Sequence, residues 1–212
     1  GLRRNRSHGA AVVDARAVVR KVVLANDVPY AHLAILPYPN LLTREFITRQ
    51  GTHCLFRAIR PEDADALQMF ARGLSEQARY FRFLSTMVEL SPSMLARFTQ
   101  IDYDREMAIV AVVHDDTGIE RIVGVVRYLL NPDAVTSEFA LVVADEYQRH
   151  GIGSALMKRI CEIARERGLK TVTGLVLGSN SDMLKLMNRL GFVEERDADD
   201  PDLRQVVLQL QE

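Results

Sequence analysis

Apolar residues recur with two different spacings along the chain from residue 53 onward. Short apolar runs bounded by turn residues predict strands over 53–59, 107–113, 121–130, 135–143, 171–177 and 203–210, and a further strand that begins at 191. Apolar residues three and four positions apart predict helices that begin near 61, 75 and 92 and helices over 151–167 and 182–190. Turn residues at 115–118 and 131–133 separate three consecutive strands, which indicates an antiparallel meander. This order of elements predicts a mixed α/β chain of the α+β class.

The first fifty residues have shorter apolar stretches than the rest of the chain. Brief apolar stretches at 10–13, 17–19 and 33–36 end at a segment that contains Pro37 and Pro39. Proline fixes an extended backbone and removes an amide donor, so this segment is predicted to be a linker. We therefore expect residues 1–45 to be a remnant and linker from a preceding region, and residues 46–212 to form one complete domain.

The bulk composition narrows the classes of function. The chain has 212 residues, of which 48% are hydrophobic and 26% are charged, and its formal net charge of -1 gives no reason to expect nucleic acid as a partner. No apolar run approaches the roughly 20 residues that span a bilayer, and no signal-peptide core follows the basic first residues. We therefore expect a cytoplasmic protein without a membrane partner. Cys54 and Cys161 lack metal-ligand spacing and are expected to be buried thiols, so no metal is predicted.

The segment Gln148–Gly153 carries the clearest chemical signal. It follows the strand predicted over 135–143 and opens the helix predicted over 151–167. Gly151 and Gly153 allow the backbone to approach an oxygen-rich ligand, and the free amides of a helix N-terminus favour an anion such as a diphosphate. A glycine turn selected for backbone geometry alone is the alternative. Two features strengthen the ligand hypothesis: Glu138 is the only acid in an apolar strand, and a second strand–helix unit turns at 178–180.

These residues resemble the acetyl-CoA signature of the GNAT (GCN5-related N-acetyltransferase) superfamily. Gln148, Gly151 and Gly153 match the signature, and Asn180 with the Gly191-Phe192 pair is similar to a later motif of the family. The resemblance implies a central, mostly antiparallel twisted sheet flanked by helices, with strands splayed at the acetyl-CoA site. It also implies which residues contact acetyl-CoA: Leu141, Val142, Val143, Gln148, Arg149, His150, Gly151, Ile152, Gly153, Ser154 and Asn180.

Three further runs narrow the resemblance. Residues 57–63, 75–83 and 98–107 are similar to bacterial protein lysine acetyltransferases in which a GNAT domain is fused to an ADP-forming acyl-CoA synthetase-like region. Residues 13–16 and 31–35 look like the tail of the ATP-grasp part of that region. The resemblance therefore implies an upstream synthetase-like region and an acceptor lysine on a protein substrate, with acyl-CoA synthetases as candidate acceptors.

A lysine amine, with an ordinary pKa of about 10.4, must lose a proton before it attacks a thioester. Glu138 is the candidate general base, because strand alternation places it on one face with Ala140 and Val142, close in sequence to the predicted cofactor turn. The alternative is a glutamate at a strand edge facing solvent. Glu106 is the second candidate base, although it equally fits a solvated turn. Asp102 and Asp104 are candidates for binding the incoming lysine.

One position departs from the family pattern. Many GNAT enzymes have a tyrosine four residues before the Gly-Phe pair as the acid for the departing thiolate, and this chain has Met187 there. Either no general acid is used, or Tyr103, Tyr128 or Tyr147 serves instead. Two other functions stay open on the same fold: a small-molecule amine N-acetyltransferase, and a non-catalytic acyl-CoA sensor.

Overall fold

The computed structural model describes residues 38–85, 87–114, 118–196 and 200–210. Its strands are β1 (Arg44–Ile47), β2 (His53–Ala58), β3 (Glu106–His114), β4 (Glu120–Leu130), β5 (Thr136–Val143), β6 (Thr171–Leu177), β7 (Val193–Arg196) and β8 (Leu203–Gln209). Its helices are α1 (Ala64–Gly73), α2 (Glu76–Phe83), α3 (Pro92–Thr99), α4 (Ile152–Glu166) and α5 (Ser181–Arg189), with 3₁₀ turns η1 (Asn40–Leu42), η2 (Pro61–Asp63) and η3 (Asp145–Tyr147).

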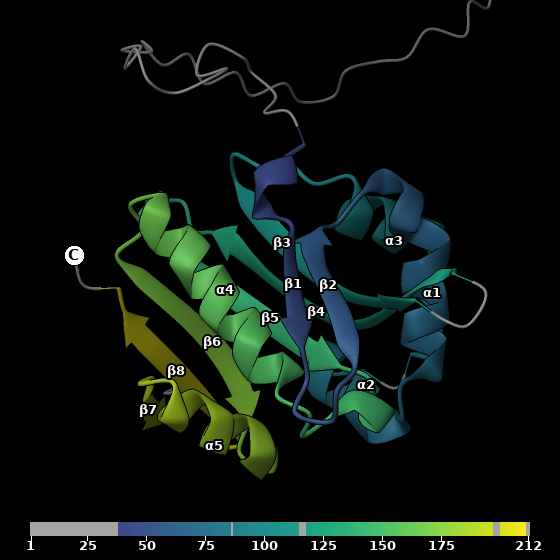
Figure 1. The fold of residues 1–212 in the computed structure, drawn as a ribbon. Coiled ribbons are helices and arrows are strands. Elements are labelled where there is room, and N and C mark those ends of the chain that lie inside the picture. The colour runs from purple at the N-terminus through teal and green to yellow at the C-terminus, as the bar shows by residue number, and fades with distance from the viewer. Residues whose placement is uncertain (1–37, 86, 115–117, 197–199, 211–212) are drawn as a thin grey trace, which may run out of the picture. The chain divides into compact units, whose positions relative to one another are not determined.

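All these strands belong to one sheet, in the order β1-β2-β3-β4-β5-β6-β8-β7 (Figure 1). Neighbouring strands are antiparallel except for the β5–β6 pair, which is parallel. The predicted mixed fold and the meander of β3, β4 and β5 are confirmed. The predicted elements after residue 53 are all present, and their ends differ from the predicted ones by only a few residues.

Strand β3 shows why the sheet carries helices on both faces. Its side chains are buried from Glu106 to Val113. The odd-numbered residues of β3, such as Ile109, pack in the hydrophobic cluster that includes α4. The even-numbered apolar residues, such as Ala108, pack in the hydrophobic cluster that includes α1. A strand buried on both faces is expected to be a nearly continuous apolar run, and this is the pattern that the sequence has. The helices α4 and α5 lie over one face, and α1, α2 and α3 lie on the other (Figure 1).

Helix ends follow the capping residues in the sequence. The hydroxyls of Ser75 and Ser91 accept the N–H groups of Ala78 and Met94, as N-cap residues do. Gly168 has φ +77°, a left-handed conformation that favours glycine after a helix. The residue chemistry therefore sets where these helices begin and end.

The segment before β2 contributes to the domain. The Tyr38 hydroxyl donates to the carbonyl oxygen of Ala58 at 2.8 Å, and β1, which begins at Arg44, pairs with β2. The last residues of the predicted remnant are thus part of the sheet, and β1 is an element that the sequence pattern missed. The short elements predicted at 10–13, 17–19 and 33–36, the proline at 37 and the turn residues 115–117 lie outside the described residues, and the origin of residues 1–45 stays a prediction.

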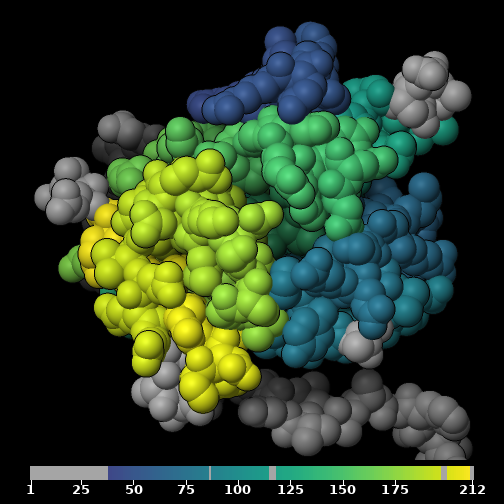
Figure 2. Space-filling view, turned by 90° about the horizontal axis from the view of Figure 1, so that it is seen from below, coloured from purple at the N-terminus to yellow at the C-terminus, as the bar shows by residue number. Residues whose placement is uncertain are grey.

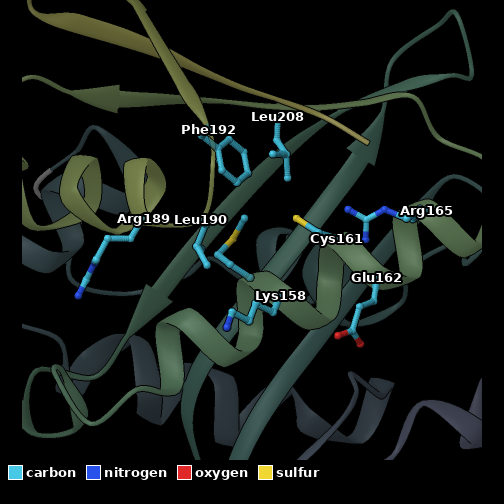
Figure 3. Close-up of a pocket in the computed structure, with 9 residues that line it drawn as sticks. Lys158, Cys161, Glu162, Arg165, Arg189, Leu190, Phe192 and Leu208 are labelled. Atoms are coloured by element: carbon cyan, nitrogen blue, oxygen red, sulfur yellow. The ribbon is translucent and has the colours of Figure 1, made fainter. Parts of the chain in front are cut away.

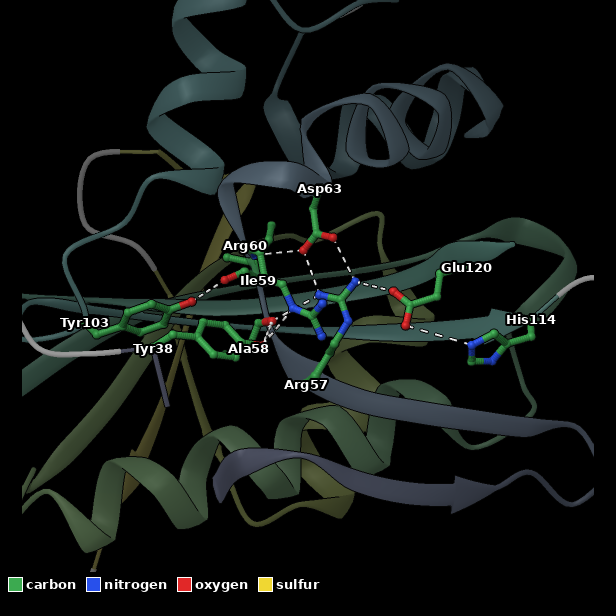
Figure 4. A network of polar contacts seen from close by, with 9 residues as sticks. All are labelled: Tyr38, Arg57, Ala58, Ile59, Arg60, Asp63, Tyr103, His114 and Glu120. Carbon is green, nitrogen blue, oxygen red and sulfur yellow. Dashed lines mark hydrogen bonds and ion pairs between the residues drawn. The ribbon is translucent and has the colours of Figure 1, made fainter. Parts of the chain in front are cut away.

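A buried charged network fixes the start of α1 against the sheet (Figure 4). Arg57, with 2% of its surface exposed, donates to both carboxylate oxygens of Asp63 at 2.7 and 2.8 Å and to Glu120 at 2.7 Å. Burial alone lowers the pKa of the Arg57 guanidinium, but the hydrogen bonds to Asp63 and Glu120 raise it on balance. The network joins β2, η2 and β4 and keeps Arg57 charged.

Candidate active site

Strands β5 and β6 separate partway along their length. They pair only at Thr136–Thr171, Ser137–Val172 and Glu138–Thr173. Beyond Glu138, strand β5 continues beside β4 and strand β6 continues beside β8. This is the splay that the family resemblance implied, and its apex lies at Glu138.

A ring and a glycine sit at the apex of the splay. A β-carbon on Gly174 would lie 2.4 Å from Cε1 of Phe139, closer than any real contact, so the ring of Phe139 occupies the space beside the β6 backbone. Phe139 also packs edge-on against Phe192, with ring centroids 5.4 Å apart. We infer that this ring holds the two strands apart, which no residue pattern in the sequence suggested.

The backbone of β5 presents hydrogen-bonding groups to the gap. The N–H of Ala144 donates to the carbonyl of Val123 in the β4 segment, and the carbonyl of Ser137 accepts the Thr173 hydroxyl of β6. Backbone N–H and C=O groups point alternately to the two sides of an antiparallel strand. The backbone groups of Leu141 and Val143 therefore point into the gap, whereas those of Val142 point toward β4. Gln148 already donates its side-chain amide to the Val143 carbonyl at 3.2 Å. The edge toward the gap therefore suits an extended ligand arm that pairs like an added strand.

The turn between β5 and α4 opens the N-terminus of α4. Gly151 is the N-cap of α4 with φ +91°, and Arg149 also has a positive φ of 62°. The first N–H groups of a helix, here those of Ile152, Gly153 and Ser154, have no intrahelical partner, and no side chain caps them. Such amides, at the positive end of the helix dipole, suit the oxygens of a diphosphate. His150 packs edge-on near Tyr147, and its buried Nδ1 has no partner among the described residues.

Two other helices border this turn. A β-carbon on Gly153 would lie 3.6 Å from Leu186 of α5, and α5 begins at Asn180, whose side chain caps it by accepting the N–H of Met183. Ser75, the N-cap of α2, donates from its N–H and its hydroxyl to Asp145 just before the turn. Seen from below, the blue α2 region, the green turn and the yellow-green α5 surround this end of the molecule (Figure 2). Asn180 is thus the N-cap of α5, and its contact with a cofactor stays a prediction.

Glu138 lies on the open part of the sheet. In the sheet it is aligned with Leu129 of β4 and Thr173 of β6. Its side chain is on the same face of the sheet as helices α1, α2 and α3. Its side chain is exposed, which agrees with the solvent-facing alternative that the sequence left open, and its role as general base stays a prediction. Leu129 and Leu175, on the same face, are 44% and 49% exposed and leave an apolar surface beside the carboxylate.

The other acidic candidates are held differently. Glu106 is buried, and its two carboxylate oxygens accept bonds from Arg97 and, at 3.1 Å, from Arg127. Asp102 accepts the N–H of Asp104 within a local turn. Glu106 is therefore a buried ion-pair partner and not the solvated turn residue that the sequence also allowed.

Two of the candidate tyrosines, Tyr103 and Tyr128, are buried in the cluster on the α4 face of the sheet. Met187 is 1% exposed in the core cluster with α4, as expected for an apolar stripe. Tyr103 donates its hydroxyl to the Ile59 carbonyl, and burial raises the pKa of Tyr103 well above its ordinary value. Burial likewise raises the pKa of Tyr128, which packs in the same cluster. Tyr147 lies in η3 beside the cofactor turn.

A separate hollow of about 260 Å³ lies between α4 and α5 (Figure 3). It is lined by Met157, Lys158, Cys161, Glu162, Arg165, Arg189, Leu190, Phe192 and Leu208. Burial raises the pKa of the Cys161 thiol to about 11, so the thiol is protonated at neutral pH. The hollow contains neither the turn residues 148–153 nor Glu138.

Among the described residues, no group of three or more His, Cys, Asp or Glu side chains is placed to hold a metal ion. In the same part of the chain, no helix has the length and apolar character needed to cross a membrane.

Known proteins agree with this geometry. The acetyltransferase (GNAT) family model matches residues 65–192. Acetyltransferase PA5475 of Pseudomonas aeruginosa is 39% identical over 150 residues, which are 71% of this chain and 80% of that protein. Acetyltransferase Pat of Mycolicibacterium smegmatis is 27% identical over 150 residues, which are 70% of this chain and only 44% of that longer protein. The solved GNAT domain of S. lividans PAT has a TM-score of 0.73 and 26% identity, and the match covers 82% of this chain and 99% of that one.

The family match covers more than half of the chain and includes the β5–α4 turn, the splayed strands and α5. The fold as a whole is similar to that of the solved GNAT domain. The chain therefore belongs to the GNAT family of acetyltransferases.

Proposed function

We propose that this acetyltransferase moves the acetyl group of acetyl-CoA to the side-chain amine of a lysine on a protein, with Glu138 as the general base. Members of the GNAT family use acetyl-CoA as the acyl donor. The residues that would hold it are the turn Gln148–Ser154 and the gap-facing backbone of Leu141 and Val143. When bound, acetyl-CoA supplies a thioester carbonyl that is open to attack by an amine.

The position of Glu138 at the apex of the splay carries this proposal. An extended ligand arm that starts at the α4 N-terminus and follows β5 toward its beginning runs directly toward Glu138, where the gap closes. The reactive end of such an arm and the carboxylate are thereby brought near each other. The exposed carboxylate is free to accept a proton from an amine that arrives across the open sheet face, directly or through a water molecule.

Glu138 suits this role better than Glu106. The carboxylate of Glu106 is buried and bonded to two arginines, so accepting a proton would weaken two ion pairs. In the proposed reaction, the amine nitrogen forms the new bond to the acetyl carbon, the carbon–sulfur bond breaks, and the amine proton passes to Glu138. Because Met187 has no proton to donate, the sulfur would leave as a thiolate, which a thiol pKa of about 8.5 makes feasible.

The open surface beside Glu138 favours a polypeptide acceptor over a small amine. A small amine is usually held in a concave pocket. Glu138 instead lies exposed beside the exposed apolar side chains of Leu129 and Leu175, where the aliphatic stem of a lysine has room to lie. An upstream acyl-CoA synthetase-like region remains part of the proposal and rests only on the resemblance of residues 13–16 and 31–35.

The test is mass spectrometry of lysine acetylation on candidate acceptor proteins, including an acyl-CoA synthetase, incubated with acetyl-CoA. We expect Glu138→Gln to lower the rate about 100-fold or more, in the usual range for loss of a general base. Glu166→Gln is the matched control, because Glu166 is an exposed glutamate of α4 with only a long 3.9 Å ion pair. Equal acetylation by wild type and Glu138→Gln would remove Glu138 from the mechanism, and no acetylated lysine with any acceptor would refute the substrate class.

A further inference from the structure

An excess of positive charge lies beneath α2 and α3, on the same sheet face as Glu138. Arg97 and Arg127 flank the carboxylate of Glu106, and Arg82 lies close enough to Arg127 for the two positive charges to repel each other. Arg97 and Arg127 both bond to Glu106, and Arg127 also stacks over Phe98, with its guanidinium carbon 4.8 Å from the ring centroid. One carboxylate therefore forms ion pairs with two arginines, and Arg82 has no acidic partner among the described residues.

Arg82 is the cation without an anion. It lies in the last turn of α2, half-buried, with its guanidinium 5.0 Å from the ring centroid of Phe83. Within the described ranges it makes no hydrogen bond or ion pair. Burial, and then the positive charge of Arg127, lower the pKa of Arg82 to about 10, so the side chain is still charged at neutral pH. A partly desolvated, unpaired guanidinium is costly, and a bound anion would remove that cost.

This cluster lies beside the proposed acceptor surface. Arg127 of β4 is aligned with Ala140 of β5, which is two residues from Glu138 and on the same face of the strand. Helix α2, which carries Arg82, packs against β5. An acceptor that places its lysine at Glu138 therefore extends over or beside Arg82 and Arg127.

We propose that Arg82 and Arg127 bind a carboxylate of the acceptor polypeptide, namely an Asp or Glu side chain within about two residues of the target lysine. This inference rests on the proposed function and names the class of acceptor sequence. A guanidinium pair matches a carboxylate in charge and in its planar, two-pronged geometry. The apolar rings of Phe83 and Phe98 limit hydration of the pair and strengthen it. The acceptor carboxylate would supply the second negative charge that Glu106 alone does not provide.

The test uses synthetic lysine peptides in pairs. Each pair has the same neutral sequence with one Glu or one Gln at position -2, -1, +1 or +2 from the lysine, and kcat/KM is measured for both members. We expect a Glu/Gln ratio of roughly tenfold for at least one position in the wild type, the size expected for a charge-assisted bond at a half-buried site. Arg82→Gln should reduce that ratio to below about twofold. Arg82→Lys should retain part of the Glu/Gln preference, because lysine keeps the positive charge but lacks the paired N–H donors of the guanidinium. Since both peptides report on the same preparation, the ratio does not depend on how much of a variant is folded.

Arg165→Gln is the matched control, because it removes one exposed arginine from α4 on the other face of the sheet, and its ratio should equal that of the wild type. Acetylation of all peptides with no preference for Glu at any position would overturn this inference and leave the proposed function intact. A ratio that survives Arg82→Gln would also overturn it. Absence of acetylation on every peptide, acidic or neutral, would overturn both.

Discussion

Replacing Gly174 by alanine should destabilise the domain by closing the space that the Phe139 ring occupies. The new methyl group would lie 2.4, 2.7 and 2.9 Å from three ring carbons of Phe139, where carbon atoms in favourable contact are about 3.5–4.0 Å apart. The ring has little room to retreat, because Phe139 is 7% exposed and packs against Phe192. Overpacking of this kind costs about 1–3 kcal/mol.

The assay is thermal and urea unfolding of the wild type and four variants: Gly174→Ala, Phe139→Leu, the two combined, and a control. A cost of about 2 kcal/mol corresponds to a fall in Tm of roughly 4–8 °C for a domain of this size. Gly73→Ala in α1 is the control: no atom lies within 4 Å of its added β-carbon, so its stability should be unchanged or raised by up to about 1 kcal/mol. Adding Phe139→Leu to Gly174→Ala should restore part of the loss, which a double-mutant cycle measures.

The reasoning is refuted if Gly174→Ala is as stable as the wild type, or if Phe139→Leu and Gly174→Ala act additively. Either result would mean that the ring and the glycine are not coupled. A different cause would then be needed for the separation of β5 from β6. The same cycle followed by acetyl-CoA titration shows whether the ring also sets the width of the gap, since a displaced ring should weaken binding.

Three further predictions follow from single contacts. Asp63→Ala should lower the free energy of unfolding by about 3–5 kcal/mol in urea titrations, because it leaves Arg57 buried with half of its partners; a loss below about 1 kcal/mol would contradict this. Gly151→Ala should cost about 1–2 kcal/mol at φ +91° and weaken acetyl-CoA binding in calorimetry, and unchanged affinity would count against the turn as the diphosphate site. Cys161 should react far more slowly with a thiol reagent at pH 8 in the folded than in the unfolded protein, since burial raises its pKa to about 11. Its contribution to stability should accordingly be complete below about pH 8.5 and decline as the pH rises toward 11.

The sequence predicted the parts of the fold that local patterns determine. The two-period apolar pattern predicted the strands and helices after residue 53, and Ser75, Ser91 and Asn180 predicted helix starts that the structure contains. The Gln148–Gly153 motif predicted a turn whose main-chain conformation depends on Gly151. In each case the relevant interaction connects residues that are close in the chain, so the pattern carries the information.

What the sequence did not predict depends on contacts between distant residues. Strand β1 is only four residues long and is stabilised by pairing with β2, which no apolar period signals. The insertion of β8 between β6 and β7, and the contact of Phe139 with Gly174, likewise arise from tertiary packing. The exposure of Glu138 was left open for the same reason, because strand alternation gives its face but not whether a helix covers that face.

The central claim is that the gap between β5 and β6 is where acetyl-CoA reacts, with its phosphates at the start of α4 and Glu138 at the closed end. A crystal structure of the protein grown with CoA tests this directly. The account predicts density for the diphosphate against the amides of Gly151–Ser154, with the sulfur within about 6 Å of the Glu138 carboxylate, a range within which one water can bridge the two groups. CoA bound in the hollow between α4 and α5, or with its sulfur directed away from Glu138, would contradict the account.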